Sequence, residues 1–324
     1  MKAGEPPSRC ARLWAALAVA AASAAFVHLR YELQPTAVSD FDQIWIAARA
    51  LVTGGDPYVA VAALPKELGF PLFYPLTAVL LGVPFAWLPI AIARAVVAAL
   101  GAGAFTYVIL RRGWWGLALV ASGSFLVAVG GVQWSPLLTA AALNPAFGFL
   151  LAAKPSVGLA LLVAFPDRRT IIGCAVLGLL SLVVRPIWPL EWLRALHANS
   201  GHLLPLVARP AGVVLLLALV RWRMPEARLL AAHACVPQTL LLYDAVPLLL
   251  TARTLRQALV LAVTTQAAVL YMHLIAKPSH TFETFSVDAW PVTLVVVYLP
   301  VLLMILLSEP RTVEVPGGMA REHA

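Results

Sequence analysis

Long runs of apolar residues recur along almost the whole chain, and they constrain its fold more than any other feature. About 20 helical residues cross a hydrocarbon core of about 30 Å, and stretches near that length return from residue 11 to residue 307. Of the 324 residues, 61% are hydrophobic and 12% are charged, too little polar surface for a water-soluble globule. Backbone amides in lipid must be hydrogen-bonded within each segment. The sequence therefore predicts an all-α, polytopic membrane helical bundle.

We expect about 9–11 transmembrane helices in this bundle. Several runs are too short or too rich in proline to cross alone. The region 132–165, which contains Pro136, Pro145 and Pro155, is typical of broken or re-entrant helices. The predicted spans are 11–29, 72–90, 91–110, 114–131, 134–152, 155–166, 170–187, 206–221, 229–252, 257–276 and 290–307. They form one domain over residues 1–324, with a cytoplasmic tail at about 308–324.

The basic residues give the predicted orientation. The net charge is +8, but lysines and arginines stand in small groups at the ends of apolar runs, which is an orientation signal and not a nucleic-acid patch. We expect a multi-pass protein of the cell inner membrane. If its first helix runs outward from a cytoplasmic amino terminus, most of the basic groups face the cytoplasm. The outward loops are then 30–71, 185–205 and 277–290, and the Tyr243-Asp244 turn faces the same side. Arg111 and Arg112 conflict with this scheme, because spans at 72–90 and 91–110 would place them outside.

Cysteines and motifs exclude several kinds of site. Cys10, Cys174 and Cys235 are far apart and lie in or beside apolar runs, so they suggest neither disulfides nor a zinc site. The chain contains no phosphate-binding loop of the Walker type, no G-x-G-x-x-G and no G-x-S-x-G, which argues against nucleotide-sugar or hydrolase chemistry. His233, in an apolar helix, is expected to be a packed and hydrogen-bonded histidine.

Three aspartates gather in the first outward loop of a chain with few acids. Apolar residues recur there at helical spacing from Phe41 to Leu51, which predicts an amphipathic helix on the membrane surface. Ser39 is a suitable N-cap, so Asp40 and Asp42 fall in the first turn, where the helix dipole favours negative charge. Capping alone is one sufficient explanation for these acids, and a functional role is the alternative. Asp56 opens an Asp-Pro-Tyr turn and is expected to be structural.

An ordered set of motifs resembles a known family. The outward loop reads S-D-F-x-x-x-W-x-A-A-R-A-L-x-x-G-x-D-P-Y, and F-Y-P-L-T opens the next predicted span. The turn at residues 132–134, the Lys154-Pro155 pair and the Tyr243-Asp244 pair follow in order. Together these resemble glycosyltransferase family 87, the polyprenol-phosphate-mannose-dependent mannosyltransferases of the GT-C class, over about residues 35–250. The chain departs from the family pattern at Ser39, where glycine is common, at Pro75-Leu76, where two prolines are common, and at the 132–134 turn.

The resemblance implies a GT-C fold and a hexosyltransferase, with mannose as the expected sugar. The donor would be a polyprenyl-phosphate sugar, and the acceptor a lipid or glycan on the extracytoplasmic face. By its place in the motif Asp40 carries over as the general base, with Asp42 as an alternative or as its orienting partner. A carboxylate suits the step in which an acceptor hydroxyl loses its proton before it attacks the anomeric carbon with inversion.

The remaining candidates follow from residue type and position. Lys154 is the first candidate for the cation that stabilises the departing phosphate. It interrupts an apolar region, where an ammonium either marks a functional path or snorkels to the interface. Arg185 is a second candidate for the departing phosphate, or an interfacial anchor. Gln133 and Tyr74 are candidates for hydrogen bonds to sugar or phosphate. An acid in lipid is costly, so the Tyr243-Asp244 pair should face a cavity or a basic partner such as Lys154.

Two other functions remain open. A lipid-linked carrier would use Lys154, Asp244 and broken helices as a translocation path, although such carriers often show internal repeats and none is evident. A non-catalytic relative would bind the lipid sugar without transfer. Neither the sugar, the acceptor nor the use of a divalent cation follows from the sequence, which shows no oxygen-rich ligand set.

Overall fold

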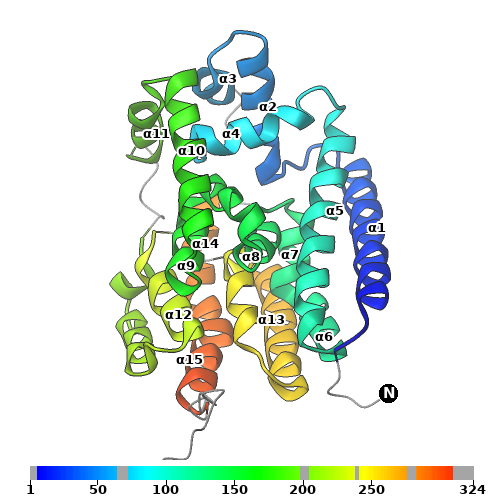
Figure 1. The fold of residues 1–324 in the computed structure, drawn as a ribbon, viewed down its shortest axis with the longest axis vertical. Coiled ribbons are helices and arrows are strands. Elements are labelled where there is room, and N and C mark those ends of the chain that lie inside the picture. The colour runs from blue at the N-terminus through cyan, green and yellow to red at the C-terminus, as the bar shows by residue number, and fades with distance from the viewer. Residues whose placement is uncertain (1–5, 64–71, 198–203, 238–240, 276–281, 309–324) are drawn as a thin grey trace, which may run out of the picture.

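The computed structural model describes residues 6–63, 72–197, 204–237, 241–275 and 282–308. This part of the chain consists of helices and connecting turns, with one isolated bridge between Pro205 and Pro237 and no strand (Figure 1). An all-α bundle is therefore confirmed. The predicted tail, apart from Ser308, lies outside the described residues.

Within the residues that the structure describes, four helical segments are long and apolar enough to cross a membrane. They are α1 (Arg9–Leu33), α5 (Ile90–Ile109) with its extension η2 (Leu110–Arg112), α13 (Leu255–Ile275), and the continuous segment made of α14 (Phe282–Thr293), η9 (Leu294–Tyr298) and α15 (Leu299–Leu306). Two bent pairs also qualify: α7 (Gly123–Gly130) with α8 (Ser135–Ala142), bent by 115°, and α10 (Arg168–Val184) with α11 (Trp188–His197), bent by 98°. The described residues thus hold up to six candidate spans, judged by length and composition, which is fewer than predicted.

The shortfall arises because several apolar runs fold into short helices. These are α4 (Leu76–Gly82) with η1 (Val83–Phe85), α9 (Pro155–Ala164), η7 (Gly212–Arg221) and η8 (Leu242–Thr251). Each is too short to cross about 30 Å. The remaining elements are α2 (Asp40–Val52), α3 (Pro57–Ala62), η3 (Trp114–Gly116), α6 (Leu117–Val120), η4 (Pro145–Ala153), η6 (Leu206–Ala208) and α12 (Pro225–Cys235).

The predicted span at 72–90 is wrong, and its absence removes the conflict over Arg111 and Arg112. Pro84 lies within η1 and Pro89 caps α5, so the run cannot continue as one helix. Only α5 then crosses between the first loop and Arg111. Because α1 and α5 lie side by side and antiparallel (Figure 1), Arg12 and Arg111 meet over the ring of Tyr107, at 5.1 and 5.5 Å from its centroid.

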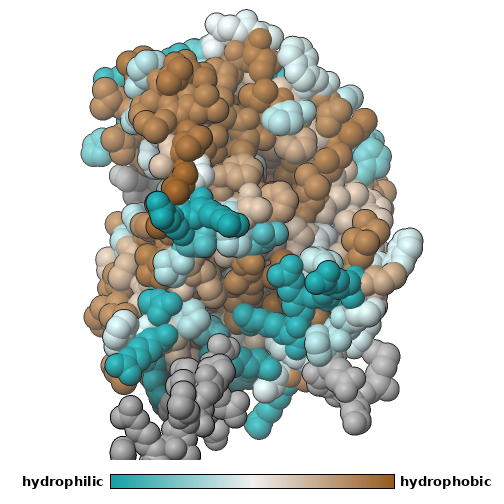
Figure 2. Space-filling model, viewed as in Figure 1, coloured by the Kyte–Doolittle hydropathy of each residue, from teal (hydrophilic) through white to brown (hydrophobic). Residues whose placement is uncertain are grey.

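Further contacts place other arginines at the same end of the molecule. Arg112 donates to the carbonyl oxygen of Ala252 at 3.3 Å, and Arg253 pairs with Glu226 at 3.1 Å. In Figure 2 hydrophobic side chains cover most of the visible face, and hydrophilic ones gather in its lower half, where the amino terminus lies in Figure 1. A basic end beside an apolar belt is compatible with a multi-pass membrane protein.

Two of the predicted outward loops, 30–71 and 185–205, meet at the other end. Arg185, which follows α10, pairs with Asp56 at the start of α3 and with Glu191 on α11 at 2.5 Å. Trp192 on α11 donates from Nε1 to the carbonyl oxygen of Phe73 at 2.8 Å. The prediction that residues 30–71 and 185–205 share one side therefore agrees with these contacts.

Helix α2 has the predicted bounds but not the predicted surroundings. Ser39 is its N-cap, and Gly54, with φ of 79°, follows its end. Its apolar face was expected to rest on lipid, yet Phe41 and Ile44 are fully buried in protein. The Phe41 ring packs edge-on against Phe85 of η1 at 5.9 Å. Tertiary packing of the apolar stripe thus fixes α2 to η1 and α4, which holds its first turn in place.

Close packing between short helices predicts a sensitive glycine. A Cβ on Gly158 of α9 would stand 2.0 Å from the carbonyl oxygen of Leu151 in η4, and backbone cannot move aside as a side chain can. We expect Gly158→Ala to destabilise the protein by about 1–3 kcal/mol. The matched control is Gly178→Ala in α10, where a Cβ meets nothing within 4 Å and helix propensity favours alanine. Thermal unfolding in detergent measures both; equal unfolding temperatures would contradict the packing argument.

Candidate functional site

The first turn of α2 carries Asp40 into the bundle. Ser39 and Asp42 form a capping box, in which the Asp42 carboxylate accepts from the backbone N–H of Ser39 at 2.8 Å. The N–H of Asp40 donates to the carbonyl oxygen of Gly131 at 3.2 Å. The turn between α7 and α8 therefore receives the start of α2, and Asp40 lies beside Gln133.

The turn between α7 and α8 contains Val132 in a strained backbone conformation that valine rarely adopts. Val132 has φ of 51°, a left-handed value that is a genuine outlier for a β-branched side chain. The conformation is held by Gln133, whose N–H donates to the carbonyl oxygen of Ala128 at 2.8 Å, and by the burial of Val132. Strain of this kind persists where the surroundings over-determine it, often at functional sites. Its result is that the buried Gln133 side chain faces Asp40 and Lys154.

Lys154 lies at the junction of η4 and α9, where Pro155 begins the new helix. Its ammonium pairs with Asp244 at 2.7 Å and lies 3.4 Å from the carbonyl oxygen of the Gln133 side chain. The Tyr243 ring stands below the ammonium, with its centroid 4.9 Å away. Asp244 is 1% exposed, so the pairing predicted as one alternative for this acid is present. Ser135 holds the facing segment, because its hydroxyl donates to the carbonyl oxygen of Tyr243 at 2.6 Å.

Asp40 joins this group of charges. Burial raises the pKa of its carboxyl above the usual value, and the nearby Lys154 ammonium and a hydrogen bond from Gln133 offset part of that rise. Burial likewise raises the pKa of the Tyr74 hydroxyl well above its usual value, as do the charge of Asp40 and a hydrogen bond between them. Asp40 stays partly accessible. It is thus a carboxyl with a raised pKa that keeps part of its surface accessible to solvent.

Six of the eight predicted site residues come together, and we name them the Asp40 cluster. They come from five separate parts of the chain: Asp40, Tyr74, Gln133, Lys154, Tyr243 and Asp244. The cluster holds two carboxylates and one ammonium in a partly buried place. Such a set can take a proton at Asp40 and offer positive charge at Lys154 within the same small volume.

The other two predicted residues lie in separate networks. Both Asp42 oxygens are engaged: Arg94 binds them through Nε at 2.7 Å and Nη2 at 2.5 Å, and Ser39 donates to both. This geometry gives Asp42 the capping role and favours an orienting part over that of a base. Arg185 faces Asp56 and Glu191, which corresponds to the anchoring alternative.

Sequence reasoning missed Arg94 and Tyr31, which lie just outside the cluster. Arg94 stands in the first turns of α5, where a charge near a helix end is usually an interfacial anchor. Only its hydrogen bonds to Asp42, on a different helix, distinguish Arg94 from such an anchor. His233 was expected to be packed and hydrogen-bonded, and this is confirmed: its ring nitrogens lie 2.9 Å from the Tyr298 hydroxyl and 2.8 Å from the carbonyl oxygen of Asp244.

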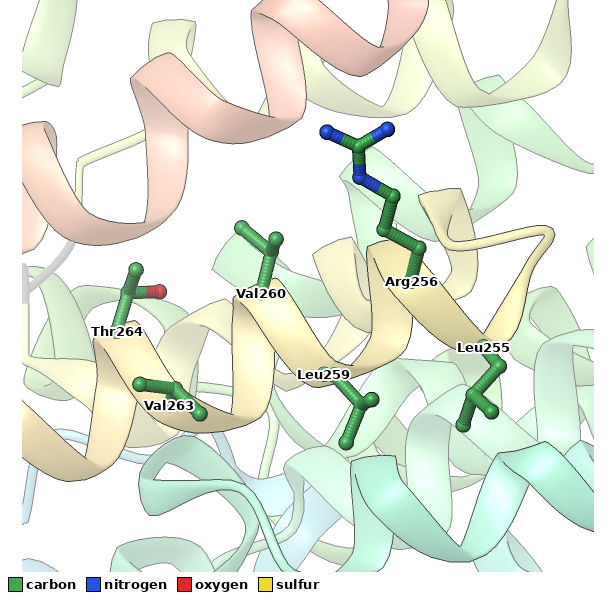
Figure 3. Close-up of a pocket in the computed structure, with 6 residues that line it drawn as sticks. All are labelled: Leu255, Arg256, Leu259, Val260, Val263 and Thr264. Carbon is green, nitrogen blue, oxygen red and sulfur yellow. The ribbon is translucent and has the colours of Figure 1, made fainter.

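An apolar groove of about 670 Å³ on α13 offers no comparable chemistry. Figure 3 shows Leu255, Leu259 and Val263 on one side of the helix, with Arg256 and Val260 on the other. No carboxylate lines the groove, and its one hydroxyl, that of Thr264, donates to the carbonyl oxygen of Val296 at 2.9 Å. Leu255, Leu259 and Val263 are exposed, as lipid-facing residues of a spanning helix are. It is not a candidate for the reacting site.

Comparison with known proteins finds no family model, no curated protein and no solved structure that matches this chain. The resemblance to glycosyltransferase family 87 is therefore neither supported nor contradicted by these comparisons. It stays a prediction that rests on the motif residues themselves.

Proposed function

We propose that the protein is a multi-spanning membrane glycosyltransferase that moves a hexose, with mannose as the expected sugar, from a polyprenyl phosphate to a lipid- or glycan-linked acceptor. The observation that carries the proposal is the meeting of Asp40, a partly accessible carboxyl with a raised pKa, with the Lys154 ammonium. The two residues are 114 positions apart in sequence. The sequence predicts Asp40 as the base for the acceptor hydroxyl and Lys154 as the cation for the departing phosphate.

The proposed reaction is a single displacement with inversion. Asp40 takes the proton of the acceptor hydroxyl as its oxygen attacks the anomeric carbon. The bond between that carbon and the phosphate oxygen breaks, and polyprenyl phosphate leaves with the electron pair. Gln133 donates to Asp40 and orients the carboxylate. Since a raised pKa brings a carboxyl closer to the pH at which a base works, burial makes Asp40 a stronger base than an exposed aspartate.

Lys154 supplies the positive charge for the leaving phosphate. An ammonium has three donors; Asp244 and Gln133 accept from it within the described residues. In the proposal the third N–H meets a phosphate oxygen. Asp244 keeps the ammonium in position, and the Tyr243 ring supports it from one face. Charge-assisted bonds of this kind are about twice as strong as neutral ones.

A divalent cation is not part of the proposal. Among the residues described here no three His, Cys, Asp or Glu side chains lie close enough to hold a metal ion. Asp40 and Asp244 both interact with the Lys154 ammonium, so the two carboxylates already share a cation. This donor set fits an amino group better than a calcium or magnesium ion, which takes at least six oxygen ligands.

The test is sugar transfer by purified full-length protein in lipid nanodiscs. A polyprenyl phosphate carrying radiolabelled mannose is supplied with a lipid extract as acceptor, and a labelled nucleotide sugar serves as the control donor. We expect label to enter the acceptor only from the polyprenyl phosphate. Absence of transfer from every polyprenyl-phosphate hexose tried, in protein shown to be folded, would end the proposal.

The rate of transfer should depend on pH through Asp40. The base must be deprotonated, and burial raises its pKa above the ordinary aspartate value. The rate is therefore expected to be full above this raised pKa and to fall about tenfold for each pH unit below it. A pH profile of kcat between pH 4 and 9 measures the position of this acid limb. A limb at the pKa of an exposed aspartate would contradict a buried base.

A carrier for lipid-linked sugar is the second candidate. Two bent helix pairs and a buried Lys154–Asp244 ion pair are features that line translocation paths. The same nanodisc preparation cannot show transport, so proteoliposomes with the labelled donor on one leaflet are needed. Movement of donor between leaflets without formation of a glycosylated product favours the carrier, and product without movement favours the transferase.

A further inference from the structure

We propose that Arg94 is a positioning residue that holds the Asp40 carboxylate toward Lys154 and Gln133. The inference rests on the proposed function, since it gives Asp40 the role of base. It starts from a partly buried arginine that is connected through Asp42 to the segment that carries Asp40, and through Tyr31 to the segment that carries Gln133.

The first connection runs through Asp42 to the residue before Asp40. Arg94 binds Asp42 with two parallel hydrogen bonds, 2.7 Å from Nε to Oδ1 and 2.5 Å from Nη2 to Oδ2. The same carboxylate accepts from the Ser39 hydroxyl at 2.6 Å and from the Ser39 N–H at 2.8 Å. The side chains of Arg94 and Asp42 are 14% and 7% exposed. Ser39 and Asp42 bracket Asp40, so this clamp fixes the first turn of α2.

The second connection runs through Tyr31 to the strained turn before Gln133. The Arg94 guanidinium lies over the Tyr31 ring, 4.1 Å from its centroid. The Tyr31 hydroxyl donates to the carbonyl oxygen of Gly130 at 3.1 Å, and the next carbonyl, that of Gly131, accepts from the N–H of Asp40 at 3.2 Å. One guanidinium thus ties α5 to the start of α2, to α1 and to the turn that carries Gln133.

The chemistry of this clamp requires an arginine. A planar guanidinium forms two parallel bonds to a carboxylate and stacks on a ring at the same time, whereas a lysine offers one point charge. Lysine keeps the charge beside Asp42 and loses the fixed geometry. A loss of orientation at a reacting group costs rate without weakening the binding of substrate, and a displacement of about 1 Å is enough for a 100-fold loss.

The test compares Arg94→Lys with a matched control, Arg253→Lys. Arg253 also pairs with a buried carboxylate, Glu226, but at the basic end of the molecule. For full-length protein in nanodiscs we expect Arg94→Lys to lower kcat by 10-fold or more, with KM for the polyprenyl-phosphate hexose within about threefold of the wild-type value. Arg253→Lys should leave kcat within twofold. Equal kcat values for Arg94→Lys and wild type would overturn the inference.

A second readout does not depend on activity, so failure of the inference and failure of the proposed function can be told apart. Hydrogen exchange followed by mass spectrometry reports the N–H groups of Ser39 and Asp40, which are bonded to Asp42 and Gly131. Arg94→Lys should accelerate exchange in the peptide that contains residues 39–42, and Arg253→Lys should not. Unchanged exchange in that peptide overturns the inference whether or not sugar is transferred. If Arg94→Lys exchanges faster in that peptide while the wild-type protein transfers no sugar, the clamp is supported and the transferase is refuted.

Discussion

Replacement of Asp40 by asparagine should reduce sugar transfer about 10²- to 10⁴-fold, which is the range that a positioned general base contributes. Asparagine has nearly the same shape, and its backbone N–H can still donate to Gly131. It cannot take up a proton in the working pH range. Because the raised pKa shows that the surroundings disfavour the charged carboxyl of Asp40, its removal should not destabilise the fold. The measurement is kcat with labelled polyprenyl-phosphate hexose, together with the unfolding temperature.

The matched control for this substitution is Asp167→Asn. Asp167 is the N-cap of α10 and accepts from the backbone N–H groups of Arg169 and Thr170 at 2.9 and 3.0 Å. Asparagine caps helices as well as aspartate does, so activity and stability should both stay at wild-type levels. Equal rates for wild type and Asp40→Asn would remove Asp40 from the reaction. Retained activity in that variant would then require a base outside the Asp40 cluster.

The sequence was informative about composition and local helix signals, and less so about where long apolar runs break. The Ser39 cap and the acids of the first turn predicted the start of α2, because capping chemistry is local. The run at 72–90 was misread as a span, since hydropathy alone does not weigh Pro84 and Pro89 against a continuous helix. The apolar face of α2 was assigned to lipid because no sequence pattern distinguishes lipid from protein as its partner.

The candidate site was likewise predictable only in part. Lys154 and Asp244 were recognisable because an isolated charge in an apolar run is expensive and needs a reason. Their pairing was one stated alternative, and it is present at 2.7 Å. The bidentate contact between Arg94 and Asp42 joins positions 52 residues apart, and no local pattern predicts it. The backbone strain at Val132 could not be predicted from the sequence either, because a valine gives no signal for positive φ.

The ion pair of Lys154 with Asp244 should have a large effect on stability when only one partner is removed. In Lys154→Met the side chain keeps most of its length and loses its charge, so Asp244, which is 1% exposed, is left without its ammonium partner. Removal of one member of a buried pair typically costs about 3–5 kcal/mol. We therefore expect Lys154→Met to unfold at clearly lower temperature or denaturant concentration than wild type in detergent.

Removal of both charges separates the stabilising role of the pair from its chemical role. In Lys154→Met combined with Asp244→Leu no buried charge remains, and replacing a buried pair by apolar side chains is often neutral or stabilising. The double variant should therefore regain much of the stability lost in Lys154→Met. It should nevertheless transfer no sugar, since the ammonium that meets the leaving phosphate is absent. A double variant that is as stable as wild type and still active would show that the buried pair serves packing alone and that the phosphate is stabilised elsewhere.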